Sequence, residues 1–287
     1  MSKRIRGVLA GVRPHFRKDT MQFKRYAGLL LGGLFAAHAG AADLPPGTPS
    51  EIGANFATLY GLRVQGGGGI AVRTDVPVAK GRPVVEVTLN NAGPALRNDF
   101  FLKGEQFPTL NGAEQAWRSY VISVFLPADG WVESDAPVTL AQIDSAVDGG
   151  QLPPPLAVQV RGSKLVLNTN FNHLPAGEAT EANTAHRSIV IGTAEKNKWH
   201  CFGIQARWSA TPAKGELYVH LNGNEVYFSR IAHNSYPSAV HVPRVGLSVP
   251  ADASIGSRKI YADFIRVVER YESAPNLLSR TPCATAN

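Results

Sequence analysis

A histidine and a tyrosine stand three residues apart in the polar segment Ala232-His233-Asn234-Ser235-Tyr236. Imidazole and phenol groups are among the side chains that exchange protons with a reacting group, and this spacing lets the two act together. A third candidate, His173, lies in another polar segment. The alternative is that His233 and Tyr236 are surface loop residues. If the two residues act together, the spacing of His233 and Tyr236 predicts a proton-transfer pair.

Other catalytic patterns are absent from the sequence. It has no Gly-x-Ser-x-Gly elbow, no His-Glu-x-x-His pair, no phosphate-cradling glycine loop and no cysteine cluster. The glycines from Gly66 to Gly69 lack a following helix signal and predict a flexible turn. No strand-like run carries the paired carboxylates of a glycoside hydrolase. We therefore predict no catalytic metal or cofactor, and a structural calcium ion stays open.

The N-terminal region has the parts of a secretory signal peptide. Lys24 and Arg25 precede the apolar run Leu29–Ala37, and small residues with Ala-x-Ala spacing continue to Ala41. The apolar run is shorter than the roughly 20 residues that a membrane span needs. We predict a signal peptide over residues 1–41, with translation starting at Met1 or Met21. The mature protein is then periplasmic or secreted and carries no membrane anchor.

The net charge of +7 belongs to this leader. Residues 1–41 hold eight Lys and Arg and one acidic residue, which leaves 21 basic and 21 acidic residues in the remainder. A nucleic-acid-binding domain normally carries a basic surface on its folded part. The neutral remainder therefore excludes nucleic acid as a predicted partner.

Two cysteines, Cys201 and Cys283, follow the predicted leader. In an oxidising compartment such a pair favours a disulfide bond, which would hold the C-terminal tail against the strand around Phe202. The alternative is a buried Cys201 with a free Cys283.

The elements that must position these residues are short strands. Apolar, branched and aromatic residues recur with a period of two in short runs separated by turn signals, and no helical stripe extends over four turns. This pattern predicts an all-β, antiparallel β-sandwich or jelly roll. We expect a flexible segment over 42–55, one monomeric domain over 56–272 and a tail over 273–287. The runs are Val84–Leu89, Tyr120–Leu126, Leu156–Val160, Leu165–Leu167, Ser188–Ile191, Trp199–Trp208, Leu217–Leu221, Val226–Phe228, Val245–Val249 and Ile260–Val268.

Two hairpins and three loops stand out between these runs. Asn222-Gly223 supplies the positive φ angles of a tight hairpin turn, and Arg161–Lys164 predicts a second hairpin. Longer polar segments at Lys103–Gln115, Ala128–Gln151 and Asn168–His186 predict loops, and loops of that length are usually functional or mobile. They could wall a groove across one sheet.

A series of motifs follows the chain in a recognisable order. It consists of Trp117–Pro127, Trp131, Leu140–Gln142, Pro153–Val158, Trp199, Arg207–Ser209, Gly215–Leu217, Leu221–Gly223 and Ile260–Asp263. From residues 80 to 270 their order and spacing resemble the heparin-lyase-like polysaccharide lyases. The resemblance implies a concanavalin-like jelly roll with a polysaccharide groove on a concave sheet. It also implies cleavage of uronic-acid polymers by β-elimination.

The resemblance implies four groove residues. Arg97 begins an Arg-Asn-Asp sequence that resembles the Arg-x-Glu element of the family, and Gln142 resembles its groove glutamine. Arg244 stands where the family has a lysine, and Trp131 where it has a loop tryptophan. In β-elimination such groups neutralise the substrate carboxylate, because the transition state is enolate-like.

Alternatives exist for two of them. Arg97 could form a structural ion pair with Asp99 or Glu105, and Gln142 could lie in a solvated loop.

The chain departs from the family at the two proton-transfer positions. Asp144 stands where the family has a histidine, and Ser248 where it has a tyrosine. Asp144 is a weak base unless burial raises its pKa, and serine cannot replace tyrosine in proton transfer. His233 and Tyr236 are therefore the predicted substitutes.

We interpret the chain as an exported, polysaccharide-lyase-like protein whose partner is an acidic polysaccharide. One alternative is a non-catalytic carbohydrate-binding module in which Trp117, Trp131 and Tyr236 stack on sugars. Another is a structural protein of the cell envelope.

Overall fold

The computed structural model describes residues 43–90, 96–104, 107–108, 116–131, 133–145, 152–175, 177–211, 213–237, 239–250 and 256–285. They belong to one compact unit, Gly40–Asn287. The predicted signal peptide and both start sites lie outside the described residues. No helix within the described ranges is long and apolar enough to cross a membrane.

The described strands form two antiparallel sheets. Sheet A contains β1 (Asp43–Leu44), β3 (Gly67–Arg73), β4 (Val84–Asn90), β7 (Arg118–Leu126), β12 (Lys198–Arg207), β13 (Gly215–Leu221), β14 (Asn224–Ala232), β16 (Arg258–Ala262) and β17 (Arg266–Val268). Its order is β14-β13-β12-β7-β16-β4-β3, while β17 pairs with β7 and β1.

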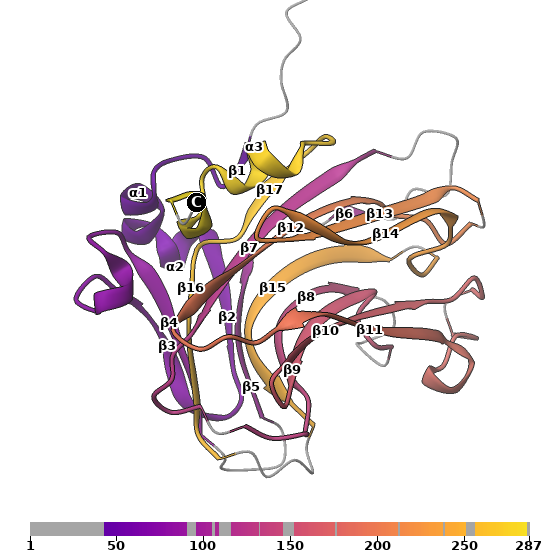
Figure 1. Ribbon diagram of the computed structural model, residues 1–287. Helices are drawn as coiled ribbons and strands as arrows, with labels where there is room; N and C mark the ends of the chain where they lie inside the picture. The colour runs from indigo at the N-terminus through magenta and orange to yellow at the C-terminus, as the bar shows by residue number, and fades with distance from the viewer. Residues whose placement is uncertain are drawn as a thin grey trace, which may run out of the picture. The chain divides into compact units, whose positions relative to one another are not determined.

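Sheet B lies against sheet A (Figure 1). It contains β2 (Tyr60–Val64), β5 (Leu96–Leu102), β6 (Phe107–Pro108), β8 (Val138–Ser145), β9 (Leu156–Arg161), β10 (Lys164–Phe171), β11 (Ala185–Thr193) and β15 (Val240–Val249). Its order is β11-β10-β9-β8-β15-β5-β2, and β6 pairs with the start of β15.

The core lies between the two sheets and follows the alternation of strand side chains. On β7, Tyr120, Ile122 and Val124 are completely buried, as are Leu165 and Leu167 on β10. Full burial of each large apolar side chain contributes about 1.5–3 kcal/mol, which explains why the period of two determines the faces. The predicted all-β sandwich of jelly-roll type is confirmed.

Helical segments occupy the margins. They are α1 (Pro49–Ala54), α2 (Phe56–Leu59), α3 (Ala274–Leu278) and the 3-10 turns η1 (Pro77–Ala79), η3 (Glu181–Asn183) and η4 (Pro282–Thr285). The prediction of a flexible segment over 42–55 is wrong for its described part. Thr48 caps α1 in a reciprocal arrangement with Glu51, and Ile52 is buried in the core. This capping box gives the Pro- and Gly-containing stretch a helical structure.

Both predicted hairpins are present. Asn222 and Gly223 have φ angles of 51° and 90° between β13 and β14, and Gly162 has a φ of 56° between β9 and β10. By contrast, Gly67 to Gly69 form the start of β3 rather than a flexible turn. Gly68 is needed there because a Cβ atom would lie 2.5 Å from the carbonyl oxygen of Thr88.

Two further features concern the C-terminal third. The predicted run Ile260–Val268 forms two strands, β16 and β17, which pair with β7 at different places. Cys201 of β12 and Cys283 of η4 form the predicted disulfide bond. The described part of the segment 273–287 is thereby ordered, with α3 packed next to sheet A.

Candidate active site

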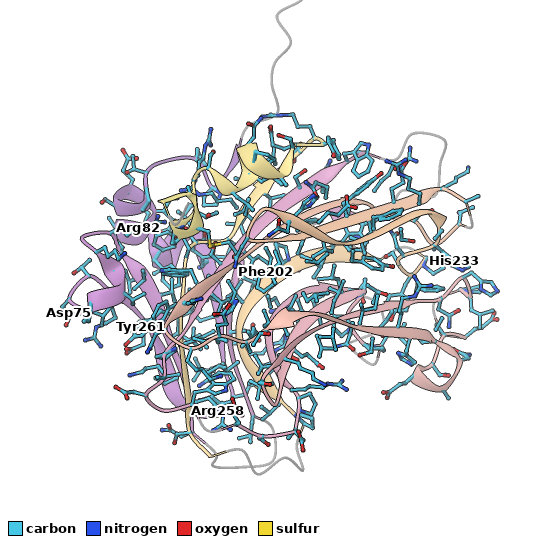
Figure 2. The ribbon with its side chains drawn as sticks, viewed as in Figure 1. Asp75, Arg82, Phe202, His233, Arg258 and Tyr261 are labelled. Carbon is cyan, nitrogen blue, oxygen red and sulfur yellow. A yellow bond between two sulfur atoms is a disulfide. The ribbon has the colours of Figure 1, made fainter. Side chains whose placement is uncertain are left out.

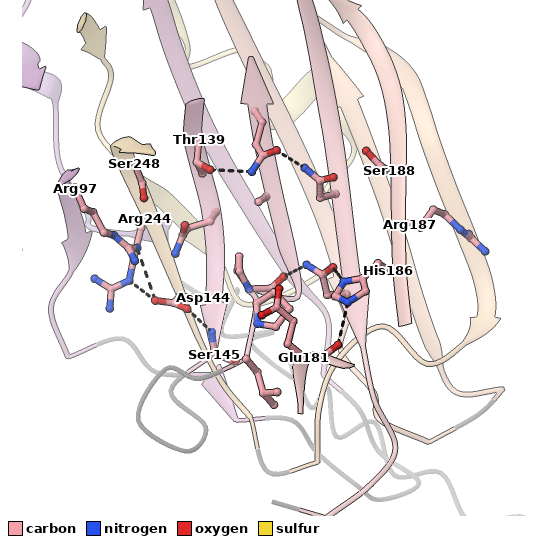
Figure 3. A pocket seen from close by; sticks show the side chains of 18 of the residues that line it. Arg97, Thr139, Asp144, Ser145, Glu181, His186, Arg187, Ser188, Arg244 and Ser248 are labelled. Atoms are coloured by element: carbon pink, nitrogen blue, oxygen red, sulfur yellow. Dashed lines mark hydrogen bonds and ion pairs between the residues drawn. The ribbon is translucent and has the colours of Figure 1, made fainter. Parts of the chain in front are cut away.

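A groove of about 930 Å³ lies over the face of sheet B that points away from the core (Figure 3). Side chains from seven strands line it, from β2 to β11 across the sheet. Most of these side chains are polar. The guanidinium groups that line it belong to Arg63, Arg97, Arg161, Arg187 and Arg244, and the carboxylates to Asp144 and Glu181. The groove therefore has an excess of positive charge.

Strand β8 supplies the middle of the groove, although the sequence predicted a loop over Ala128–Gln151. Gln142 is only 7% exposed on this strand, so the alternative of a solvated loop position is wrong. The pairing of β8 with β9 shifts between Thr139 and Ala141. Such a bulge changes the alternation, which is why Thr139 and Gln142, three residues apart, both line the groove.

Arg97 and Arg244 hold two aspartates between them. Arg97 on β5 pairs with Asp99, the ion pair that was one of its predicted alternatives, and still lines the groove. The Nε atom of Arg244 donates to Oδ2 of Asp144 at 2.9 Å, and its Nη1 lies 3.4 Å from Oδ1 of Asp99. Arg97 approaches Asp144 to 3.9 Å. Both arginines therefore occupy the predicted groove with preset orientations.

Gly246 makes room for this network. A Cβ atom at Gly246 would lie 2.5 Å from the Cα of Asp99, on the neighbouring strand β5. The guanidinium of Arg244 also lies over the ring of Phe101, 4.5 Å from its centroid. The close approach of the two strands and this stacking hold Arg244 with little freedom.

Sequence reasoning missed Arg63. Burial and the neighbouring Arg97 and Arg244 lower its pKa, in that order, while Asp99 and Asp144 oppose the shift. Three guanidinium groups thus surround two carboxylates and leave one surplus positive charge at this end of the groove. Only the position of Arg63 on β2, the strand next to β5, could have revealed that this residue lines the groove.

His186 was also missed, because it stood at the end of a segment predicted to be a loop. It is the second residue of β11 and lines the other end of the groove (Figure 3). Its Nδ1 lies 2.7 Å from Oδ1 of Asn170, and its Nε2 lies 3.2 Å from the carbonyl oxygen of Glu181. Because Nδ2 of Asn170 donates to the oxygen of Pro154, its Oδ1 is an acceptor. Both ring nitrogens of His186 therefore lie against protein oxygens, which fixes the orientation of the ring.

The predicted pair His233 and Tyr236 does not line the groove. Tyr236 is completely buried and its hydroxyl donates to the carbonyl oxygen of Pro153 at 2.8 Å; burial raises its pKa. His233 lies at the end of the sandwich (Figure 2) and stacks on Phe171 with ring centroids 4.6 Å apart. Burial, and then His173, lower the pKa of His233. Neither side chain is among those that line the groove with Arg97, although Tyr236 holds Pro153, which does line it.

Trp131 also lies elsewhere. Its side chain is buried in the core, so it cannot stack on a bound sugar, contrary to its predicted role. Lys196 and Arg258 lie over its ring at 4.7 and 5.4 Å from the centroid. Within the described residues, no group of three or more His, Cys, Asp or Glu side chains could hold a metal ion.

Comparisons with known proteins agree with this architecture. The profile of the polysaccharide lyase family matches residues 55–266. The fold is similar to that of an endo-β-1,4-glucuronan lyase from the fungus Trichoderma reesei, with a TM-score of 0.62 and 15% identity, covering 75% of this chain and 92% of that one. A family 7 alginate lyase gives a TM-score of 0.46 and 14% identity over 68% and 82% of the two chains. No curated protein matches the chain.

Proposed function

The chain belongs to the polysaccharide lyase family, and from that premise we propose that it binds a uronic-acid polysaccharide in the groove over sheet B and cleaves it by β-elimination. The observation that carries this proposal is the excess of guanidinium groups over carboxylates along the groove. Guanidinium groups bind carboxylates in a planar, two-pronged geometry, and a uronic-acid polymer offers one carboxylate on every such sugar.

The reaction requires three things of the site. The carboxylate on C5 must be neutralised, a base must take the C5 proton, and the oxygen that leaves C4 must gain a proton. The electron pair of the C5–H bond forms a C4–C5 double bond as the C4–O bond breaks. Arg97, Arg244 and Gln142 are the groups that would hold the carboxylate while charge develops on it.

Asp144 is the candidate base. Its carboxylate lies 2.9 Å from Arg244, so a substrate carboxylate held by that arginine would bring its C5 proton close to Asp144. The surplus positive charge around Arg63 allows two carboxylates to share this end of the groove. Water would supply the proton to the leaving oxygen.

His186 would serve another sugar of the same polymer. Strand β11 is separated from β8 by β9 and β10, and strands lie about 4.8 Å apart. The imidazole therefore belongs roughly 14 Å along the sheet from Asp144, which is too far for both to act on one C5 atom. We assign Arg161 to binding a carboxylate of that sugar, and His186, whose two ring nitrogens already contact protein oxygens, to holding the wall of the groove.

A second function, binding without cleavage, is favoured by one observation. Both oxygens of Asp144 already have partners, since Oδ2 accepts from Arg244 and Oδ1 from the backbone N–H of Ser145. If these bonds persist when substrate is bound, they stabilise the ionised carboxylate of Asp144 and weaken it as a base toward the C5 proton. The groove would then hold an acidic glycan and release it unchanged.

Ultraviolet absorbance of the unsaturated uronate product distinguishes the two. The purified chain is incubated with glucuronan, alginate and other uronic-acid polysaccharides, beside the variants Asp144→Asn and His233→Gln. We expect absorbance to rise for one polymer, to be abolished in Asp144→Asn and to be unchanged in His233→Gln. Binding without any rise identifies the non-catalytic function, and neither binding nor a rise rejects the proposal.

We also propose that the protein works outside the cytoplasm. The leader sequence and the Cys201–Cys283 disulfide bond support this, because disulfides persist in oxidising compartments. Fractionation of producing cells, with the intact mass of the recovered protein, tests it. A protein that stays in the cytoplasm with residues 1–41 attached would contradict export.

A further inference from the structure

A second cavity, of about 570 Å³, adjoins the groove at the hairpin between β9 and β10. Arg161 and Ser188 line both spaces. In the groove, Asn168 of β10 pairs directly with Ser188 of β11. Two residues further along each strand, and so on the same face of sheet B, Val166 pairs with Val190 in the cavity. A polymer that lies in the groove can therefore extend into this cavity.

The floor of the cavity is apolar, unlike the floor of the groove. Val190 is 57% exposed, and Val166 beside it is 5% exposed. The next two positions on this face of β10 are Asn168 and Asn170, which line the groove. The valine pair can support the C–H face of a sugar ring, because contact removes apolar surface from water, and it offers a charged group no partner.

One wall of the cavity carries two carboxylates. Glu133 and Asp135 line it, and both residues are exposed. Within the part of the chain that the structure describes, neither carboxylate takes part in a hydrogen bond or an ion pair. An ionised carboxylate only accepts hydrogen bonds, so a ligand that satisfies Glu133 and Asp135 has to bring donors. Sugar hydroxyls are such donors, whereas the carboxylate of a uronic acid is not.

This wall is held in place by the hairpin. The N–H of Gly162 donates to the carbonyl oxygen of Ser134, which stands between the two acidic residues, at 2.8 Å. Gly162 has a φ of 56° in the turn, and a Cβ atom there would lie 3.5 Å from Oδ1 of Asp135. The carboxylates are therefore positioned at the hairpin before any ligand binds.

The basic residues of the cavity leave it without a surplus of positive charge. Arg161 and Lys164 line it, in equal number to the carboxylates. The guanidinium of Arg161 donates to Oε1 of Gln159 at 3.0 and 3.3 Å, and Gln159 lines the groove, so Arg161 is directed toward the groove. Outside the lining, burial lowers the pKa of Lys196 and the charge of Glu133 opposes that shift. The cavity therefore lacks the net attraction for anions that the groove has.

We propose that this cavity is a subsite for an uncharged sugar, so that the protein selects a polysaccharide in which neutral sugars accompany the uronic acids. The inference rests on the proposed function, because the groove has to bind the uronic acids of the same polymer. Val166 and Val190 support the ring of the neutral sugar. Glu133 and Asp135 accept hydrogen bonds from its hydroxyls. A uronate in this position would bring its carboxylate close to two others and be repelled.

Titration calorimetry with two oligosaccharides of equal length tests the proposal. One is an oligoglucuronate, and the other carries glucose in place of both terminal glucuronates. We expect the wild type to bind the glucose-ended ligand about tenfold more tightly, and Glu133→Gln/Asp135→Asn to lose most of that preference. Asp129→Asn/Glu225→Gln changes two exposed carboxylates outside both linings and should keep it. Equal preference in the two double variants overturns the inference.

A second pair of variants tests the apolar floor. Val190→Asp should weaken binding of the glucose-ended ligand about tenfold, because it removes the apolar surface and adds a charge. Val64→Asp is the matched control, since Val64 of β2 is 50% exposed and lines neither space. It should leave the affinity unchanged. Equal affinities of Val190→Asp and Val64→Asp for the glucose-ended ligand contradict the subsite.

The groove and the cavity fail in different ways in this experiment. Arg244 lines the groove and not the cavity, so Arg244→Gln should weaken both ligands by the same factor and keep the preference between them. A wild type that binds both ligands equally overturns the neutral-sugar subsite and leaves the groove proposal standing. A wild type that binds neither ligand overturns both.

Discussion

Replacing Asp144 by Asn and Arg244 by Gln should change the affinity of the groove for an anionic oligosaccharide in opposite directions. The two side chains form one ion pair within the cluster of Arg63, Arg97, Arg244, Asp99 and Asp144. Removing the arginine takes away the surplus positive charge of this cluster. Removing the carboxylate charge adds to it, and the amide oxygen of Asn can still accept a hydrogen bond from Arg244.

The magnitudes follow from the contacts. A hydrogen bond between charged groups contributes about 1.5–3 kcal/mol, so Arg244→Gln should weaken binding by about 10- to 150-fold. A ligand carboxylate roughly 6 Å from Asp144 is repelled by about 2–3 kcal/mol at an effective dielectric constant of about 20. Salt screens part of this repulsion, so Asp144→Asn should strengthen binding by about tenfold.

Titration calorimetry with oligoglucuronate at low and high salt measures both effects. The thermal midpoint of each variant is measured beside it, because both substitutions break a partly buried ion pair. The difference between the two variants should shrink as salt is raised. Equal weakening by Asp144→Asn and Arg244→Gln would refute the reasoning, since it would mean that Asp144 contributes to affinity mainly by holding Arg244 in place rather than by opposing the ligand charge.

Three other measurements address stability. The Cys201–Cys283 bond joins residues 82 positions apart. Its loss should lower the free energy of unfolding by about 4.5 kcal/mol in the chain-entropy treatment. If urea denaturation shows a change below about 1 kcal/mol, the bond does not restrain the unfolded chain in this way. Tyr236→Phe should cost about 1 kcal/mol of stability, because the hydroxyl bond to Pro153 is lost, and should leave turnover unchanged; a large loss of turnover would return Tyr236 to the site. Burial lowers the pKa of His200 in the folded state, so the unfolded chain takes up its proton first as pH falls through about 6.5. Stability should then decrease on acidification, and His200→Gln should flatten that slope in denaturation curves; an identical slope would exclude His200 as a cause.

The fold was largely accessible from the sequence because its strands alternate strongly. Runs such as Tyr120–Leu126 place every second side chain in the core, and Asn222-Gly223 adopts the positive φ angles that its composition predicts. The prediction failed where the alternation is interrupted. Val138–Ser145 lies in the centre of sheet B, yet both its core-facing and groove-facing sides contain buried residues, and a bulge divides it.

The site was only partly accessible for the same reason. Arg97, Gln142, Asp144 and Arg244 were found through the resemblance of their motifs, and all four line the groove. His186 was not, because no local pattern shows that a residue at a loop boundary begins an edge strand. The pairing of strands that are distant in the sequence determines which residues share a face of the sheet, and no single segment of the sequence specifies that pairing.

The misassigned pair illustrates what a spacing can and cannot establish. The segment of His233 and Tyr236 lies where the chain leaves β14 and approaches β15. The Tyr236 hydroxyl donates its hydrogen bond to the carbonyl oxygen of Pro153. A buried phenol bonded in this way joins two segments of the chain rather than exchanging protons with a ligand. In contrast, Asp144 and Arg244 are a hundred positions apart and 2.9 Å from each other, because β8 and β15 are neighbours. A charged pair that is brought together across strands and faces a groove is therefore the stronger evidence for chemistry, and it is where substitutions should affect catalysis before they affect folding.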